Sequence, residues 1–379
     1  MHRGFDSLGS CSSVSWSSNG VALTTAYAEI DLEALSPGVI RVRMLRRGEG
    51  NLRLPPSFTV VEHSWPTPAV TCEERTHCIR LSTSQITVEV QKHPLRVSFI
   101  RPDGTAVAAD SPAHGMGWTE HGVGCYKESA PGTHFYGFGQ RTGFLDKQRT
   151  AMTLWNSDVN PHTPGTDSLY VSIPFFIAFS GQSAYGVYMD TAARSTFNMG
   201  RPKFMPWASE IDLCPLPYPE VDAGEYWFGT EGERLDYYFF AGPEISDVVH
   251  AYSDLTGRME LPPLWALGYH QCRFSYCPES QVREVARAMR EADIPCDAIY
   301  LDIDYMDGFR VFTFNPRHFP DPAGLISDLG KDGFKVVTIV DPGVKVDSQY
   351  SVYRQGRRKR VFVRRPDGKT YKGRVWPGV

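Results

Sequence analysis

The fold of this chain is decided by two stretches, Pro262-Pro-Leu-Trp-Ala-Leu-Gly-Tyr-His-Gln-Cys-Arg273 and Tyr300-Leu-Asp-Ile-Asp-Tyr-Met-Asp-Gly308. Each contains a short apolar run, and we expect strands at residues 264–269 and 298–304. Between them, apolar residues recur at helical spacing after Pro278, a residue suited to the first turn of a helix. A buried strand, an amphipathic helix and a second buried strand are typical of a βαβ unit, in which the two strands are parallel.

The same alternation continues toward the C-terminus. Asp321 and Pro322 favour a helix start, that helix is expected to end near Gly333, and residues 335–341 predict a third strand. Repeated strands that end in polar residues and are followed by helices predict a (β/α)8 TIM barrel, with its site at the carboxyl ends of the strands. A doubly wound sheet is the alternative, but no G-x-G-x-x-G motif follows any of these strands. A whole barrel takes about 250 residues, so residues 262–379 are expected to form an incomplete barrel.

The earlier part of the chain has the pattern of strands. Apolar and polar residues alternate at positions 40–44 and again in residues 86–99, which is the period expected where one face of a sheet is buried. We therefore expect an antiparallel β-sandwich at residues 1–241, with residues 111–170 as a long functional loop. A helical connector is expected at residues 242–261.

Composition limits the kinds of function. The 379 residues carry a net charge of -4, which gives no electrostatic reason to expect nucleic acid or an anionic membrane as a partner. The basic run at residues 354–365 precedes a Pro-Asp-Gly turn, so we interpret it as the solvated edge of a β-hairpin. No apolar run reaches the roughly 18 residues of a membrane span, and the N-terminus lacks a signal-like apolar core, which favours a cytoplasmic protein. The scattered cysteines predict free thiols rather than a disulfide framework or a zinc site.

Two carboxylates stand at the end of the second expected strand. Alternate residues of a strand face the same way, which would put Asp302 and Asp304 on one face with their α-carbons about 6.6 Å apart. They could form a catalytic acid/base pair, as in glycosidases. They could instead hold substrate hydroxyls, because an ionised carboxylate only accepts hydrogen bonds. Together with Asp307 they could bind a divalent metal, or one of them could serve as a cap or pair with an arginine.

Three further residues are candidates with less specific signals. Asp341 ends the third expected strand in the same manner as Asp304 ends the second. Asp158 lies near Trp155 in the expected aromatic loop, where an aspartate is commonly a turn residue. Trp376 stands between Val375 and a proline, and a buried structural tryptophan is the usual explanation for such a residue.

Taken together, these motifs resemble glycoside hydrolase family 31, the α-glucosidase family. The resemblance is carried by residues 262–273 and 301–308, by Val340-Asp-Pro-Gly-Val344 and by Val375-Trp-Pro-Gly378. Upstream, Tyr136-Gly-Phe-Gly-Gln140 and Leu154-Trp-Asn-Ser-Asp158 are similar to the family's N-terminal domain, a galactose-mutarotase-like sandwich.

The resemblance implies a retaining, exo-acting hydrolase that removes terminal α-linked glucose from oligosaccharides. Position by position, Asp302 matches the aspartate that holds the terminal sugar, Ile303 its apolar neighbour, and Trp376 a tryptophan of the pocket wall. Asp158 matches a loop aspartate that the sandwich domain lends to the same pocket, and Asp341 a further carboxylate near it. No metal ligand and no cofactor is implied.

One departure from the family pattern concerns catalysis. The family's nucleophile lies in a Trp-x-Asp-Met-Asn-Glu motif, followed later by the acid/base residue, and these 379 residues do not contain that motif. We therefore expect the N-terminal portion of an α-glucosidase, with no catalytic residue of its own and no activity by itself. The alternatives are a carbohydrate-binding module without catalysis, an α-xylosidase of the same family, and a sugar mutarotase, for which the sandwich sequence shows no clear pair of His and Glu.

Overall fold

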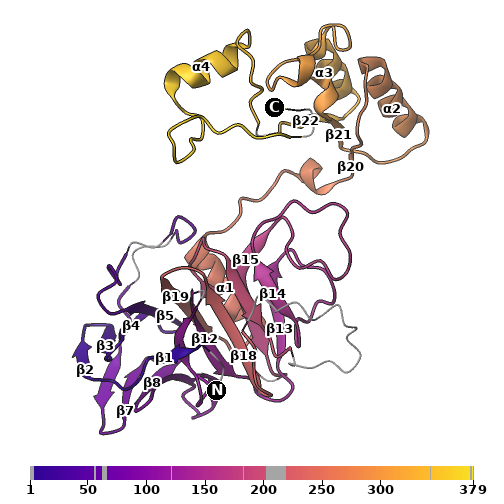
Figure 1. Cartoon of the computed structure of the whole chain (residues 1–379). Coiled ribbons are helices and arrows are strands. Elements are labelled where there is room, and N and C mark those ends of the chain that lie inside the picture. Colours follow the sequence, from indigo (N-terminus) through magenta and orange to yellow (C-terminus); the bar gives the residue numbers. More distant parts are fainter. Residues whose placement is uncertain are drawn as a thin grey trace, which may run out of the picture. The chain divides into compact units, whose positions relative to one another are not determined.

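The computed structural model describes residues 4–54, 57–61, 66–120, 122–181, 183–201, 219–341, 343–375 and 378. The chain divides into two compact units, Met1–Arg258 and Met259–Val379 (Figure 1). The first unit is built almost entirely of strands, whereas strands and helices alternate in the second.

The described part of the first unit forms three antiparallel sheets, as expected for the sandwich. The largest has the strand order β13 (His134–Gly139), β15 (Ser172–Phe179), β16 (Ala184–Met189), β19 (Arg234–Ala241), β5 (Val39–Arg46), β4 (Ala28–Ser36), β3 (Gly20–Thr24) and β2 (Ser13–Trp16). A second has the order β10 (Ala106–Ala109), β9 (Leu95–Ile100), β8 (Thr87–Lys92), β7 (Cys78–Ser82) and β6 (Thr71–Glu74). The third has the order β1 (Asp6–Ser7), β11 (Met116–Thr119), β12 (Gly122–Glu128), β18 (Glu225–Thr230), β17 (Ser195–Asn198) and β14 (Ala151–Leu154).

Apolar residues from all three sheets form one buried cluster, because each strand turns alternate side chains inward. Phe99 of β9 stacks on Phe239 of β19 with ring centroids 3.9 Å apart, which joins two of the sheets. The polar positions of the alternation at residues 40–44, Arg41 and Arg43, do not lie on a solvent face, since both are about 95% buried. Arg41 donates to Asp236 over 2.9 and 2.7 Å, and Arg43 is ion-paired with Asp31, so both charges are neutralised inside the protein.

The expectation of a long loop at residues 111–170 is also wrong, because β11, β12, β13 and β14 lie within it. Glycines hide the alternation that marks these strands. A Cβ at Gly124 of β12 or at Gly229 of β18 would collide with the ring of Trp227. These glycines are required by a tertiary contact, which a period-of-two pattern does not reveal.

Helix α1 (Ile245–Thr256) packs on the sandwich and belongs to the first unit. Its Val248 and Leu255 are fully buried, and Tyr252 stacks on Phe175 of β15 with ring centroids 3.9 Å apart. The helix ends at Gly257, whose φ of 90° suits a glycine C-cap. The expected connector, residues 242–261, is therefore divided between the two units.

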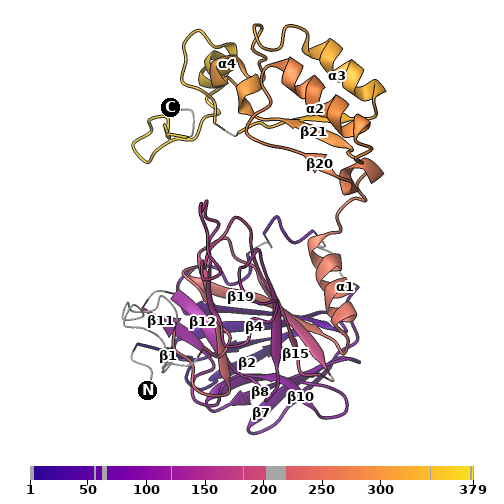
Figure 2. The same ribbon diagram turned by 90° about the vertical axis from the view of Figure 1, so that its right-hand side faces the viewer.

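The second unit contains βα repeats. Strands β20 (His270–Gln271), β21 (Ala298–Leu301) and β22 (Lys335–Thr338) form a parallel sheet in that order. Helix α2 (Glu279–Glu291) follows β20, α3 (Pro322–Lys331) follows β21, and α4 (Ser351–Lys359) follows β22 (Figure 2). Asp321 caps α3 as predicted, since its Oδ1 accepts from the Gly324 amide over 2.9 Å. The prediction of a sandwich followed by an incomplete (β/α)8 barrel is confirmed.

Two local predictions in this unit are wrong. Residues 264–267 form a short 3₁₀ helix, and the strand begins later, at His270. Most of the basic run lies on α4 instead of a hairpin edge. The hairpin is confined to residues 363–371, where Arg364 pairs with Thr370 around the Pro-Asp-Gly turn. Apolar periodicity does not predict this helix, because its one fully buried position is Gly356, which has no side chain to mark it.

Among the described residues, no helix is long and apolar enough to span a membrane. Their seven cysteines are free thiols, and Cys214 lies outside the described residues.

Candidate functional site

The carboxyl ends of the parallel strands in the second unit lie level with one another. Ala298 pairs with both His270 and Lys335, and Leu301 pairs with Thr338. The pairing of β21 with β22 extends one residue beyond β22, because the Ile339 amide donates to the Leu301 carbonyl over 2.9 Å. Residues that follow β21 and β22, including Asp302 and Asp341, are therefore presented at the same edge of the sheet.

Asp302 caps a short helix. It follows the last residue of β21, and its Oδ1 accepts from the Ile303 amide over 2.8 Å at the start of a 3₁₀ helix, Ile303–Tyr305. Asp302 is half-buried. The pKa of the Cys272 thiol, which directly follows β20, is raised by the burial of that thiol and by the negative charge of Asp302. Within the described residues, no donor contacts Asp302 Oδ2.

The expected alternation of Asp302 and Asp304 on one strand face is wrong. The strand stops at Leu301, Asp302 is the extended residue that caps the following 3₁₀ helix, and Asp304 lies inside that helix. The two carboxylates are therefore not alternate residues of one strand, which was the arrangement that suggested an acid/base pair. No group of three or more His, Cys, Asp or Glu side chains suited to a metal ion occurs among the described residues either.

A cavity of about 380 Å³ opens at the strand ends of the second unit. Its lining is largely apolar and comes from three places: the segment after β21, the segment after β22, and the C-terminal hairpin. Ile303 and Asp341 both line it, and Ile303 is only 8% exposed. The structure thus brings these two predicted residues together, whereas Asp302 lies beside Ile303 in the chain and does not line the cavity.

Asp158 lies in the first unit, on the segment that follows β14. Its carboxylate is close to the Tyr170 hydroxyl, and burial and this contact both raise the pKa of that phenol. Tyr170 is 43% exposed, and Trp155, three positions before Asp158 in the chain, is 52% exposed. A carboxylate on a segment with exposed aromatic side chains has the chemical character of a sugar-binding surface, with hydrogen-bond acceptors and flat apolar faces.

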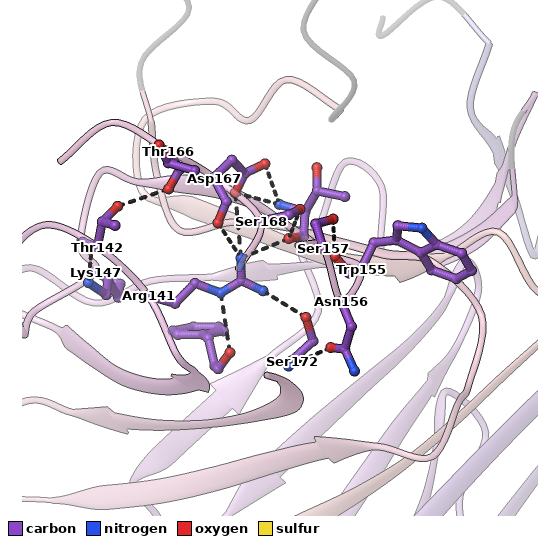
Figure 3. A network of polar contacts seen from close by, with 12 residues as sticks. Arg141, Thr142, Lys147, Trp155, Asn156, Ser157, Thr166, Asp167, Ser168 and Ser172 are labelled. Atoms are coloured by element: carbon purple, nitrogen blue, oxygen red, sulfur yellow. Dashed lines mark hydrogen bonds and ion pairs between the residues drawn. The ribbon is translucent and has the colours of Figure 1, made fainter. Parts of the chain in front are cut away.

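Arg141 holds this segment in place (Figure 3). Its side chain is only 3% exposed, and Nη1 donates to the carbonyls of Thr153 over 2.9 Å and Asp167 over 2.6 Å. Nη2 donates to Ser172 Oγ over 3.3 Å, and Nε to the Phe138 carbonyl over 3.2 Å. Burial lowers the pKa of Arg141, an effect that Asp167 opposes. One guanidinium therefore ties together both ends of the segment that carries Asp158.

The carboxylate of Asp167 completes this anchor. Both of its oxygens lie 2.9 Å from the Thr153 amide, and Asn156 Oδ1 accepts from the Ser172 amide over 2.8 Å. In Figure 3 the Trp155 side chain points away from this network, toward the side opposite Arg141. The contacts fix the backbone and leave the aromatic ring free to meet a ligand.

Some site residues were not found from the sequence, and one predicted residue is not placed. Trp376 lies outside the described residues. Phe362, Tyr371 and Lys345 line the cavity but stand in no motif that marks them. The role of Arg141 depends on a contact with Asp167, 26 positions later, which no local pattern signals.

Among the described residues of the sandwich, one His and Glu pair lies close together, and the sequence did not reveal it. His114 Nδ1 lies 3.7 Å from Glu225 Oε1, and both side chains are nearly buried. The Glu225 oxygens already accept hydrogen bonds from Ser111 Oγ and the Asp222 amide. A carboxylate whose two oxygens are occupied by protein donors is poorly suited to act as the base of a mutarotase.

Comparison with known proteins identifies the family. The Glycosyl hydrolase 31 N-terminal galactose mutarotase-like domain matches residues 29–198, and the Glycosyl hydrolases family 31 TIM-barrel domain matches residues 259–379. Alpha-glucosidase 2 of Bacillus thermoamyloliquefaciens is 42% identical over 351 residues, which are 90% of this chain and 42% of that protein. An alpha-glucosidase of Saccharolobus solfataricus is 34% identical over 246 residues, 65% of this chain and 32% of the relative.

Solved structures agree with these matches. A family 31 dextranase of Flavobacterium johnsoniae, complexed with isomaltotriose, superposes with a TM-score of 0.86 at 27% identity, over 98% of this chain and 44% of the other. The chain thus spans less than half the length of the relatives named here. Domain models of one family match more than half of its residues, and they match both of its structural units. The chain therefore belongs to glycoside hydrolase family 31.

Proposed function

We propose that this chain is the sugar-binding, N-terminal part of a retaining, exo-acting α-glucosidase that removes terminal α-linked glucose from oligosaccharides. The proposal is supported by family membership and by relatives that are named alpha-glucosidases or a dextranase. The observation that carries it is the half-buried Asp302 at the end of a parallel strand, the position where barrels of this type place their sites.

Asp302 is proposed to hold hydroxyl groups of the terminal sugar. Its Oδ1 is fixed by the Ile303 amide, while Oδ2 has no donor among the described residues and can accept from a ligand. Ile303 supplies an apolar contact next to it, and Asp341 a second acceptor from the cavity wall. Asp302 lies next to the cavity and does not line it, while Asp341 and the apolar wall lie within it. Carboxylate acceptors and an apolar wall suit a neutral sugar, whose hydroxyls donate and whose ring carbons are apolar.

Asp158 and Trp376 are proposed as further sugar-binding residues. Asp158 is supported by its exposed aromatic neighbours and by the anchored backbone that carries it. For Trp376 the support is the match of Val375-Trp-Pro-Gly378 to the family motif.

The nucleophile and the acid/base group are proposed to lie outside these 379 residues. Retaining glycosidases need two carboxyl groups about 5 to 5.5 Å apart across the scissile bond. Asp302 precedes a 3₁₀ helix and Asp304 lies within it, so the strand alternation that suggested this pair is absent. We therefore expect that residues 1–379 alone release no glucose from maltose or from a nitrophenyl α-glucoside.

Calorimetric titration of the chain with maltose tests the proposal. Asp302→Asn should weaken maltose binding by about tenfold or more, because a hydrogen bond to a charged acceptor contributes about 1.5–3 kcal/mol. Asp328→Asn, an exposed aspartate on α3, is the matched control and should leave binding unchanged. Unchanged binding in Asp302→Asn would contradict the assigned role. Clear turnover by the unmodified chain would contradict the proposed absence of the catalytic pair, and tighter binding of an α-xyloside would favour the α-xylosidase alternative.

A further inference from the structure

The second unit carries a strongly basic surface that the proposed function does not use. Residues 351–375 contain ten basic residues and one acidic residue, which leaves 29 basic and 42 acidic residues in the rest of the chain. All ten basic side chains are exposed. We call them the basic surface: Arg354, Arg357, Arg358, Lys359, Arg360, Arg364, Arg365, Lys369, Lys372 and Arg374.

Most of these charges have no counter-charge within the described part of the protein. Arg365 and Lys369 approach Asp367 at 3.8 and 4.0 Å, and no other carboxylate of the described residues lies within ion-pair distance of the basic surface. On α4, Arg354 is followed by arginines at three and four positions further on, and such like-charge pairs destabilise a helix. The negative end of the helix dipole relieves this repulsion only in the last turn. A surface that costs stability in this way is suited to an anionic ligand.

The basic surface is continuous with the strand-end cavity. Phe362 lines the cavity, and its ring packs against Gly356 of α4 and stacks on Tyr353 with centroids 5.6 Å apart. Lys372 and Tyr371 belong to the same segment as the basic hairpin and also line the cavity. Residues that line the cavity and residues of the basic surface therefore belong to one packed segment that includes α4 and the hairpin.

Lys345 adds a second ammonium group to the cavity lining. Its Nζ donates to the Gly308 carbonyl over 2.7 Å, which places the charge at the cavity wall. The lining therefore holds two lysines and a single carboxylate, Asp341, among the described residues. The two ammonium groups therefore favour a negative substituent on the sugar that the cavity receives.

We propose that the basic surface binds oxyanion groups, either phosphate or carboxylate, carried by the oligosaccharide whose terminal sugar enters the cavity. This inference rests on the proposed function, and it names the substrate class as anionic α-glucosides. Arg binds such groups in a bidentate manner, and several cations close together bind them cooperatively. A long nucleic acid fits less well, because the remaining residues are strongly acidic and repel an extended polyanion.

Four ligands test the inference by calorimetry on the full chain at low and high salt. They are maltotetraose, maltotetraose phosphorylated at the C6 hydroxyls, maltotetraose oxidised at C6 to glucuronate, and a single-stranded oligonucleotide of matched charge. The phosphorylated or oxidised sugar should bind about tenfold tighter than the neutral one at low salt, and the gain should shrink at high salt. The two anionic arms show whether phosphate or carboxylate is preferred.

Substitutions on α4 test whether this helix causes the tighter binding of anionic sugars. Arg357→Gln combined with Arg358→Gln should abolish most of the gain for the anionic sugars and leave neutral maltotetraose unchanged. Arg287→Gln is the matched control, since this exposed helical arginine on α2 already has Glu284 and Glu291 as partners. Thermal unfolding should show that the double variant keeps its stability, because it removes only exposed, mutually repelling charges.

The outcomes separate this inference from the proposed function. Binding of neutral maltotetraose with no gain for the anionic sugars would leave the proposed function standing and overturn the inference. A gain that survives the double variant would overturn it too. Tighter binding of the oligonucleotide would reassign the surface to nucleic acid, and a failure of all the sugars to bind would overturn both proposals.

Discussion

Single residues in this chain act across long sequence separations, and Arg141 is the clearest example. Its buried guanidinium contacts carbonyls from Thr153 and Asp167, so it closes the segment that carries Asp158. Lysine cannot reproduce these contacts, because its single ammonium lacks the planar fork of donors. Arg141→Lys should therefore lower the free energy of unfolding of the first unit by about 2–4 kcal/mol and increase amide hydrogen exchange across residues 155–171.

The matched control for Arg141 is Arg149→Lys, a nearby exposed arginine for which little change is expected. Hydrogen exchange distinguishes local anchoring from general destabilisation, since only local anchoring predicts that residues 155–171 open before β5 or β19. Unchanged exchange in this segment would show that Arg141 does not hold it. A loss of maltose binding without any change in exchange would point to a direct contact of Arg141 with the sugar.

At the scale of elements, features that depend on neighbouring residues could be predicted from the sequence, whereas features that depend on tertiary contacts could not. The start of α3 followed from Asp321 and Pro322, because capping depends only on neighbouring residues. The end of β21 was misplaced because Ile303 and Tyr305 are buried at alternate positions, as in a strand, although they lie on a 3₁₀ helix. The burial of Arg41 could not be predicted from the sequence, because its partner, Asp236, comes 195 positions later.

The candidate site shows the same division. The strand-end position of Asp302 and Asp341 could be predicted, because strands of this pattern present their carboxyl ends to one edge of the sheet. The cavity wall formed by Phe362 and Tyr371 could not, since it depends on how the segment after α4 folds back onto residues after β21 and β22. The motifs indicated the family, while the contacts of Arg141 and the residues that line the cavity could be found only from the structure.

Replacing a helical glycine by alanine is expected to have opposite effects on stability at two positions of the second unit. A Cβ on Gly356 of α4 would come within 2.9 Å of Phe362 Cε1, whereas a Cβ on Gly330 of α3 would meet open space. Gly330→Ala should stabilise the second unit by about 0.5–1 kcal/mol, the usual gain in helix propensity. Gly356→Ala should destabilise it by about 1–3 kcal/mol and displace Phe362 from the cavity wall.

Thermal and urea unfolding of both variants check this contrast. The Gly330 variant serves as the internal control, since it has the same chemical change without the collision. Stabilisation by Gly356→Ala of the same size as by Gly330→Ala would show that Phe362 does not pack against α4. In that case the proposed continuity between the cavity and the basic surface would lose its support.

For the whole molecule, the two units differ in how completely they bury their apolar residues. The sandwich has a large core, whereas the second unit exposes Leu264 at 86%, Phe312 at 74% and Val363 at 73% and has a parallel sheet of short strands. Open strand edges and exposed apolar side chains favour local opening and association. Limited proteolysis should therefore cut first within residues 259–379 and leave a resistant fragment that ends near residue 258. A dye that binds exposed apolar surface should fluoresce more with the whole chain than with that fragment. First cuts within β4, β5 or β19 would contradict this order, because those strands lie in the middle of the largest sheet, where local opening should be rarest.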